Sequence, residues 1–295
     1  MSTSVKIRKQ RKRPLEMIFH GIFFASAVVS ILSVLVIAFF IFYSGSPALS
    51  KIGILDFIFG TTWDTDAGKF GILTFIVGTL GITIGSTLLG VLVGIFTAVF
   101  LAEIAPKRIT SFIRPAINLL SGIPSVVYGF FGLIVIVPIV KSTFGGYGQS
   151  LLAGILVLTI MILPTIISIT ETSIRSVPKE FKEGSLALGA THIQTIFKVM
   201  IPAAKSGIMA GIILGIGRAI GETMAVILVT GNSTLMPHSL TDPIRTLTTN
   251  IALQMSYAVK LQKDALFATG IVLFVFIIIL NLILNLFINR KAGYK

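Results

Sequence analysis

Long apolar runs constrain this chain more than any other feature of its sequence. Six runs of about 20 or more mostly apolar residues are each long enough to cross roughly 30 Å of hydrocarbon as a helix. Helices satisfy their own backbone polar groups inside a bilayer, and the alternating pattern of barrel strands is absent. We therefore expect an all-α integral membrane protein with six transmembrane helices. The predicted spans cover approximately residues 17–43, 72–102, 112–140, 150–173, 206–229 and 265–288.

The charge distribution sets the expected orientation. Only 12% of the residues are charged, whereas a soluble domain carries roughly 25%, which argues against a soluble enzyme. The net charge is +13, and most of the 24 Lys and Arg residues fall in the N-terminal segment 1–16, the second and fourth connections and the tail 289–295. The positive-inside rule then puts both termini in the cytoplasm. Basic residues beside anionic membrane lipid account for the excess charge without a nucleic-acid partner.

The sequence offers no catalytic or nucleotide-binding constellation. It contains neither a G-x-x-x-x-G-K-[ST] phosphate loop nor a His-Glu-x-x-His zinc motif, and it has no cysteine. The histidines His20, His192 and His238 fall at a membrane edge or in predicted loops, away from any serine at mid-membrane depth. We expect a chain that is not an enzyme and that carries no metal or other cofactor of its own.

The predicted fifth span carries charges at a depth where the bilayer makes them costly. Three glycines and two charged residues share one helical stripe about 80° wide, at 100° per residue. Small residues at four-residue spacing let another helix or a ligand approach the backbone closely, so we expect this stripe to face protein or a water-filled cavity. The five residues are Gly207, Gly211, Gly215, Arg218 and Glu222.

Two interpretations of these charges remain open. Arg218 and Glu222 are four residues apart, so they can form a structural ion pair that neutralises itself inside the bundle. Alternatively, the guanidinium of Arg218, a planar fork of donors, binds a tetrahedral oxyanion in transit. In that case Glu222 holds Arg218 when no anion is bound, or makes anion binding weak enough for release. Helical spacing alone does not choose between them.

Prolines interrupt the third and fourth predicted spans. Pro124, in the segment 122–129, removes a backbone donor from the helix interior, and Pro164 acts similarly in the fourth span. A packing kink explains each proline singly. Together with a charged fifth span they favour a transport path, because broken helices at membrane depth line cavities or are buried in protein. The candidate pathway residues are Arg218, Glu222, Thr223, Ser125 and Tyr128.

The fourth connection, 175–205, is the longest predicted cytoplasmic segment. Pro178 and Glu180 indicate a helix start, Gly189 interrupts the pattern, and Pro202 ends a second short helical stretch. Two short helices that meet at a glycine form a compact knob. The knob is either an amphipathic loop on the membrane surface or a docking surface for another protein.

The knob resembles the E-A-A-x3-G-x9-I-x-L-P box of ABC importer permeases, which seats the permease on its ATPase subunit. The matching stretch reads Glu183-Gly-Ser-x3-Gly189-x9-Val199-x-Ile201-Pro202, with glycine and serine in place of the two alanines. The resemblance implies an ATPase-coupling loop. Its candidate residues are Glu183, Gly184, Ser185, Gly189, Ala190 and Pro202.

Four further segments resemble the phosphate-specific transport permeases: 70–80, 100–107, 122–129 and 217–226. The Met-Ala-Val ending of the last segment is similar to the PstC-type subunit of that family. The resemblance implies a type I ABC importer permease fold in a prokaryotic cell membrane, with a core of about 72–288 and the first helix outside it. It also implies a heterodimer with a PstA-type permease, a cytoplasmic ATPase dimer that carries ATP and magnesium, and an extracytoplasmic phosphate-binding protein. In that family the residues that match Arg218 and Glu222 are implicated in phosphate passage.

These observations lead us to expect a permease subunit that moves inorganic phosphate inward, driven by ATP hydrolysis on a separate chain. A permease for another tetrahedral oxyanion, such as sulfate or molybdate, stays open because one arginine does not distinguish anions of like shape. A non-conducting membrane sensor or scaffold is the alternative from a different class.

Overall fold

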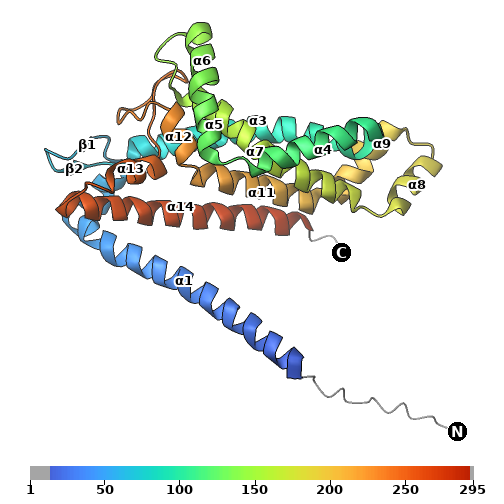
Figure 1. Cartoon of the computed structure of the whole chain (residues 1–295), viewed down its shortest axis with the longest axis horizontal. Helices are drawn as coiled ribbons and strands as arrows, with labels where there is room; N and C mark the ends of the chain where they lie inside the picture. The colour runs from blue at the N-terminus through green and yellow to red at the C-terminus, as the bar shows by residue number, and fades with distance from the viewer. Residues whose placement is uncertain (1–13, 293–295) are drawn as a thin grey trace.

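The computed structural model describes residues 14–292 as a bundle of long helices with one short β-hairpin (Figure 1). The predicted basic segment 1–16 lies largely outside the described residues, and the tail 289–295 lies partly outside them. The elements labelled η are π-helical turns. The elements in chain order are α1 (Pro14–Ile52), α2 (Ile54–Phe59), β1 (Trp63–Asp64), β2 (Lys69–Phe70), α3 (Leu73–Val99), η1 (Phe100–Ile104), α4 (Lys107–Gly122), α5 (Ser125–Phe131), η2 (Gly132–Ile136), α6 (Val137–Phe144), α7 (Leu151–Arg175), α8 (Lys179–Ala187), α9 (His192–Thr195), η3 (Ile196–Met200), α10 (Ile201–Ala203), α11 (Lys205–Gly221), α12 (Met224–Val229), α13 (Leu247–Gln254) and α14 (Lys260–Ala292).

The predicted number of spans is confirmed only in part. Within the described residues, five helical segments are long and apolar enough to cross a membrane, and a sixth requires counting two helices bent by 70° as one span. The bent pair is His192–Ala203 with Lys205–Gly221. The five segments are Ile18–Ile52, Leu73–Ile104, Ser125–Phe144, Leu151–Arg175 and Lys260–Ile283.

The third predicted span, 112–140, is the one that the structure changes most. Its first residues belong to α4, an amphipathic helix that begins earlier, at Lys107. Helix α4 ends at Gly122, and α5 begins after Pro124, whose backbone is extended at φ −58° and ψ 141°. Pro124 thus separates two helices instead of kinking one, because its ring and its missing N–H stop the helical hydrogen-bond pattern. The segment that qualifies as a span is Ser125–Phe144.

Helix α7 lies at the centre of the bundle, with α3 and α11 packed against it. Pro164 lies inside α7, and the helix continues past it. The glycine stripe of α11 faces α7: a Cβ at Gly207 would lie 2.5 Å from the Cβ of Ser173 and closer still to its hydroxyl. A Cβ at Gly215 would lie 3.0 Å from Cγ1 of Ile166. For its three glycines, the expectation that the stripe faces protein or a cavity is confirmed in favour of protein, since small residues let two helices approach closely.

Gly207→Ala is expected to push α11 away from α7 and to lower stability by about 1–3 kcal/mol, the usual cost of overpacking a tight contact. Rotation of Ser173 does not relieve the clash, because its Cβ is itself 2.5 Å from the added atom. The matched control is Gly217→Ala on the same helix, where a Cβ meets nothing within 4 Å and helix propensity favours alanine. Thermal unfolding of the purified chain measures both variants, and equal midpoints would contradict the packing argument.

The structure contains a two-stranded antiparallel hairpin, β1–β2, where an all-α fold was expected. Asp64 stabilises its turn, because Oδ1 accepts hydrogen bonds from the N–H groups of Asp66 at 2.9 Å and Ala67 at 3.0 Å. Gly68 closes the turn with φ +65°, a conformation that glycine adopts most readily. Strands of two residues are too short to produce a periodic sequence signal.

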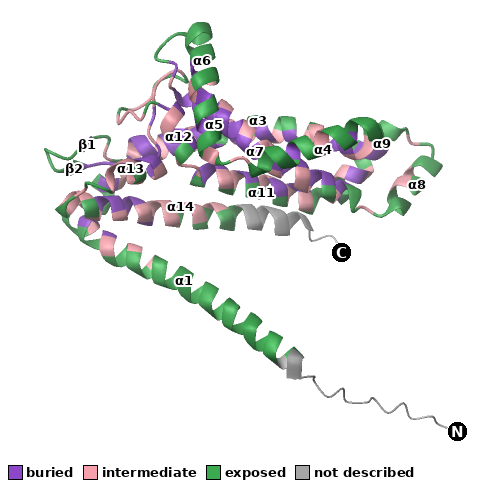
Figure 2. Cartoon of the chain, viewed as in Figure 1, coloured by how far each residue is buried: buried purple, intermediate pink, exposed green. Residues whose placement is uncertain are grey.

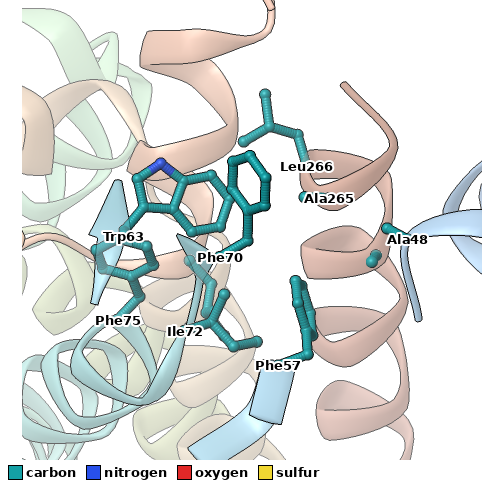
Figure 3. Close-up of a cluster of buried hydrophobic side chains, with 10 residues drawn as sticks. Ala48, Phe57, Trp63, Phe70, Ile72, Phe75, Ala265 and Leu266 are labelled. Atoms are coloured by element: carbon teal, nitrogen blue, oxygen red, sulfur yellow. The ribbon is translucent and has the colours of Figure 1, made fainter. Parts of the chain in front are cut away.

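The hairpin places its aromatic side chains in a buried cluster at one end of the bundle (Figure 3). Trp63 lies edge-on to Phe70, with ring centroids 5.2 Å apart, and 5.5 Å from the ring of Phe75. The indole Nε1 donates a hydrogen bond to Oε1 of Gln254 at 2.9 Å. Leu266 of α14 belongs to the same cluster. The hairpin therefore connects α3, α13 and α14.

Helix α1 diverges from the bundle and approaches α14 near its own C-terminal end (Figure 1). There Phe40 lies edge-on to Phe267, with centroids 5.5 Å apart. Along most of α1 the apolar side chains are exposed (Figure 2), and Phe24 is 72% exposed. A continuous apolar surface of this kind matches the hydrocarbon of a bilayer.

Candidate functional site

Two helix breaks meet beside the middle of α7. The first separates α4 from α5 at residues 123–124, and the second separates α11 from α12 at residues 222–223. Helix α5 packs directly on α12, since a Cβ at Gly129 would lie 2.7 Å from Cα of Ala225. Both helices share a buried cluster with Met161 of α7. Discontinuous helices of this kind form the substrate sites of many transporters.

Side chains satisfy backbone groups that the two breaks release. Tyr128 donates its hydroxyl proton to the carbonyl of Leu120, in the last turn of α4, at 2.7 Å. Thr248 donates to the carbonyl of Glu222 at 3.2 Å. Because an unsatisfied backbone group in hydrocarbon costs several kcal/mol, these bonds allow the breaks to persist. Thr248 was not predicted as a site residue: a capping box at Thr246 marks the start of α13 but gives no sign of this contact.

Arg218 lies half-buried in the last turn of α11, next to the second break. The ion pair with Glu222, one of the two interpretations left open by the sequence, is not formed, and no carboxylate of residues 14–292 lies within 4.0 Å of the guanidinium. The helix ends at Gly221, so the four-residue spacing no longer brings the two side chains together on one helical face.

Glu222 has a different partner. Its Oε1 accepts a hydrogen bond from the backbone N–H of Ala225 at 3.1 Å, in the first turn of α12. A carboxylate at a helix N-terminus satisfies a donor that has no intrahelical partner and is favoured by the helix dipole. Thr223 next to it donates to the carbonyl of Gly221 at 3.3 Å, and Ser125 is the first residue of α5 at the other break. The five predicted pathway residues therefore all lie at the two breaks.

Glu222→Ala is expected to destabilise the protein by about 1 kcal/mol, because the N–H of Ala225 loses its side-chain acceptor. Glu222→Gln keeps an acceptor oxygen and serves as the matched control, so its unfolding midpoint should stay near that of the native protein. Thermal unfolding of the purified protein separates the two variants. If Glu222 instead formed a buried ion pair with Arg218, both variants would leave the guanidinium unpaired. The free energy of unfolding would then fall by about 3–5 kcal/mol in each.

The predicted knob lies beyond the end of α7 that carries Arg175 (Figure 1). Helix α8 begins after Pro178, as expected, and Gly189 follows it with φ +85°. The second helical stretch ends at Ala203, one residue after Pro202, where the chain bends by 70° into α11. Of the predicted coupling residues, Glu183, Gly184 and Ser185 lie on α8, Gly189 and Ala190 follow it, and Pro202 lies in α10.

The knob is attached to the bundle and presents apolar side chains outward. Nζ of Lys182 lies 2.5 Å from Oε2 of Glu103, which ties α8 to the π-helical turn η1. The hydroxyls of Ser185 and Thr195 lie 3.0 Å apart and join the two short helices. Leu188 is 91% exposed. Exposed apolar side chains with polar neighbours are typical of a surface that another protein covers.

Comparisons with known sequences give relatives over most of the chain. Residues 90–293 match the family described as "Binding-protein-dependent transport system inner membrane component". The chain is 40% identical over 274 residues to the probable ABC transporter permease protein YqgH of Bacillus subtilis, covering 90% of this chain and 89% of that protein. It is 35% identical over 279 residues to the phosphate transport system permease protein PstC of Mesorhizobium japonicum, covering 88% and 85%.

Solved structures of low sequence identity share the fold. A chain of a bacterial alginate ABC transporter, in complex with an alginate-bound periplasmic protein, gives a TM-score of 0.62 at 16% identity, over 92% of this chain and 94% of that chain. A chain of the inward-facing MetNI methionine ABC transporter gives a TM-score of 0.60 at 19% identity, over 75% and 95%. At these identities the likeness concerns the fold alone.

Proposed function

Because the chain belongs to the family of binding-protein-dependent transport system inner membrane components, we propose that it is the PstC-type permease subunit of an ABC importer for inorganic phosphate. A permease of this family with the type I fold is a multi-pass membrane subunit, and ATP is hydrolysed on a separate chain. The observation that supports an anionic substrate is Arg218, which lies at a helix break without a carboxylate of the described chain in contact. The names of PstC relatives such as that of Mesorhizobium japonicum support phosphate as the anion.

The geometry supports a simple role for three of the five pathway residues. The guanidinium of Arg218 supplies a fork of donors to two phosphate oxygens, and Tyr128 holds the first break through its hydrogen bond to the carbonyl of Leu120. Glu222, held by the N–H of Ala225, keeps a negative charge close to the site. That charge weakens anion binding, so phosphate is released when the pathway opens to the other side.

The proposed assembly contains a PstA-type permease, a cytoplasmic ATPase dimer with ATP and magnesium, and an extracytoplasmic phosphate-binding protein. The knob receives the ATPase. Its link from Lys182 to Glu103 carries the movement to η1 and α3. The N-terminal end of α1 and the C-terminal end of α14 point toward the end of the bundle that carries the knob (Figure 1), which supports cytoplasmic termini.

Reconstitution tests the proposal directly. Proteoliposomes that contain this chain with its sister permease and ATPase, supplied with the loaded binding protein, are expected to accumulate radiolabelled phosphate only when ATP can be hydrolysed. Excess sulfate or molybdate should not compete. Competition by either anion would contradict selectivity for phosphate and would make that anion a second substrate. The absence of ATP-dependent uptake of any of the three would contradict a transport role.

A further inference from the structure

A cavity of about 320 Å³ lies between α4 and the last two turns of α7. Its polar lining residues are three or four positions apart on each helix, so they share the two facing sides. The cavity is separate from Arg218: Ser168, the first residue of α7 that lines it, lies seven residues, about 10 Å, beyond Met161, which packs beside the helix breaks. Helix α4 contributes Arg114 and Asn118, and α7 contributes Ser168, Glu171, Thr172 and Arg175.

One buried carboxylate holds two guanidinium groups beside this cavity. Glu171 is 7% exposed, and its Oε1 accepts hydrogen bonds from Nε of Arg114 at 2.7 Å and from Nε of Arg175 at 3.0 Å. Glu171 is the one acidic residue among the described lining residues. The wall therefore carries two positive charges against one negative charge, and salt screens partly buried charges less than exposed ones.

Donors remain available around the cavity. Arg175 also donates to the carbonyl of Leu101 at 2.7 Å, yet each guanidinium has five N–H donors, so both arginines keep unused ones. The amide of Asn118, on an exposed residue, and the hydroxyl of Ser168, on a half-buried one, line the same space. Convergent N–H and O–H donors with excess positive charge suit a tetrahedral oxyanion.

We infer that this cavity binds a phosphate group, either as free inorganic phosphate or on a lipid headgroup. The anion lies against Arg114 and Arg175, and Asn118 and Ser168 bond its remaining oxygens. Glu171 orients both guanidinium groups before the anion arrives, which reduces the entropy lost on binding, while its charge keeps the affinity moderate. The inference concerns a second site and does not depend on which anion Arg218 conducts.

A single reporter thiol tests this site in the assembled transporter. The chain has no cysteine, so Thr172→Cys places one thiol at the cavity, and maleimide labelling is read from the gel band of this chain. In nanodiscs of phosphatidylcholine, inorganic phosphate is expected to slow labelling relative to chloride at equal ionic strength. In nanodiscs that also contain phosphatidic acid, slow labelling without added phosphate identifies the headgroup as the occupant. Ser176→Cys, exposed outside the cavity, should label at one rate throughout.

Two charge variants are expected to act in opposite directions on one quantity. This quantity is the phosphate concentration at which labelling of the reporter thiol is slowed to half of its maximal effect. Arg114→Gln reduces the net charge of the cavity wall from +1 to zero and is expected to raise that concentration about tenfold. Glu171→Gln raises the net charge of the wall from +1 to +2 and is expected to lower that concentration about tenfold. A tenfold change is the effect of one unit charge roughly 6 Å from the anion at an effective dielectric constant near 40. Arg108→Gln, on an exposed part of α4, is the matched control and should change nothing.

A purely structural cluster predicts another result, in which both variants loosen α4 and speed labelling whatever the phosphate concentration. That result overturns the inference, and so does labelling that neither phosphate nor phosphatidic acid slows. Glu171→Gln decides the question even if Arg114→Gln fails to assemble, because glutamine can still accept a hydrogen bond from each arginine. Uptake is not measured in this assay, so its failure leaves the proposed function standing.

Discussion

Arg218→Ala is expected to abolish ATP-dependent phosphate uptake while the transporter still assembles. No carboxylate of the described chain lies within 4.0 Å of this guanidinium, so the truncation leaves no buried acid without its partner. The variant loses two charge-assisted hydrogen bonds to the anion, each worth about 1.5–3 kcal/mol. Uptake should therefore fall by at least about 100-fold.

Arg218→Lys separates the charge from the fork of donors. Lysine keeps the positive charge but offers a single ammonium in place of a planar pair of donors, so partial uptake is expected. Arg108→Ala, at an exposed position of α4, is the control and should transport like the native chain. Co-purification of the ATPase measures assembly, and radiolabelled phosphate in proteoliposomes measures uptake. Full uptake by Arg218→Ala would remove the anion role, and loss of assembly would make Arg218 a structural residue.

The lengths of the apolar runs predicted the uninterrupted helices well. Helices α3, α7 and α14 begin and end within a few residues of the spans at 72–102, 150–173 and 265–288, because a helix that crosses hydrocarbon needs a continuous apolar run. Helix α1 instead continues nine residues past the span at 17–43, to Ile52. The third and fifth spans were less accurate, since average hydropathy does not register a break of two residues. Pro124 marks the first break by its chemistry. The second break, at Glu222, follows no proline, and nothing in the local pattern separates it from a continuous helix.

The residues of the candidate site were predicted better than their contacts. The pair of Arg218 and Glu222 was derived from helical spacing, and it fails because the helix ends between them. The contact of Glu171 with Arg175 follows from a spacing of four residues. The contact of Glu171 with Arg114 joins residues 57 positions apart, and it exists only because α4 packs against α7. Such contacts depend on tertiary packing, which local spacing does not reveal.

Gly189→Asp and Glu183→Lys are expected to leave the chain inserted in the membrane and to prevent productive docking of the ATPase. Gly189 has φ +85° and nothing of the described part of the chain within 4 Å of an added Cβ. A side chain there strains the backbone by roughly 1–2 kcal/mol, which reorients α8 against α9 without disturbing the spans. Glu183 is exposed on α8, so reversing its charge alters the docking surface and not the interior.

The control for backbone strain is Gly68→Asp. Gly68 also has a positive φ, +65°, and nothing within 4 Å of an added Cβ, but it lies in the hairpin at the other end of the bundle (Figure 1). Gly68→Asp should keep the ATPase bound. Each knob variant should either lose the ATPase or retain an ATPase whose ATP hydrolysis is not stimulated by the loaded binding protein. Pull-down of the ATPase and stimulated ATP hydrolysis measure the two effects. If both knob variants recover the ATPase normally and show normal stimulation of ATP hydrolysis, then α8 and Gly189 do not transmit the work of the ATPase. If Gly68→Asp loses as much bound ATPase as the knob variants do, the loss is caused by backbone strain alone.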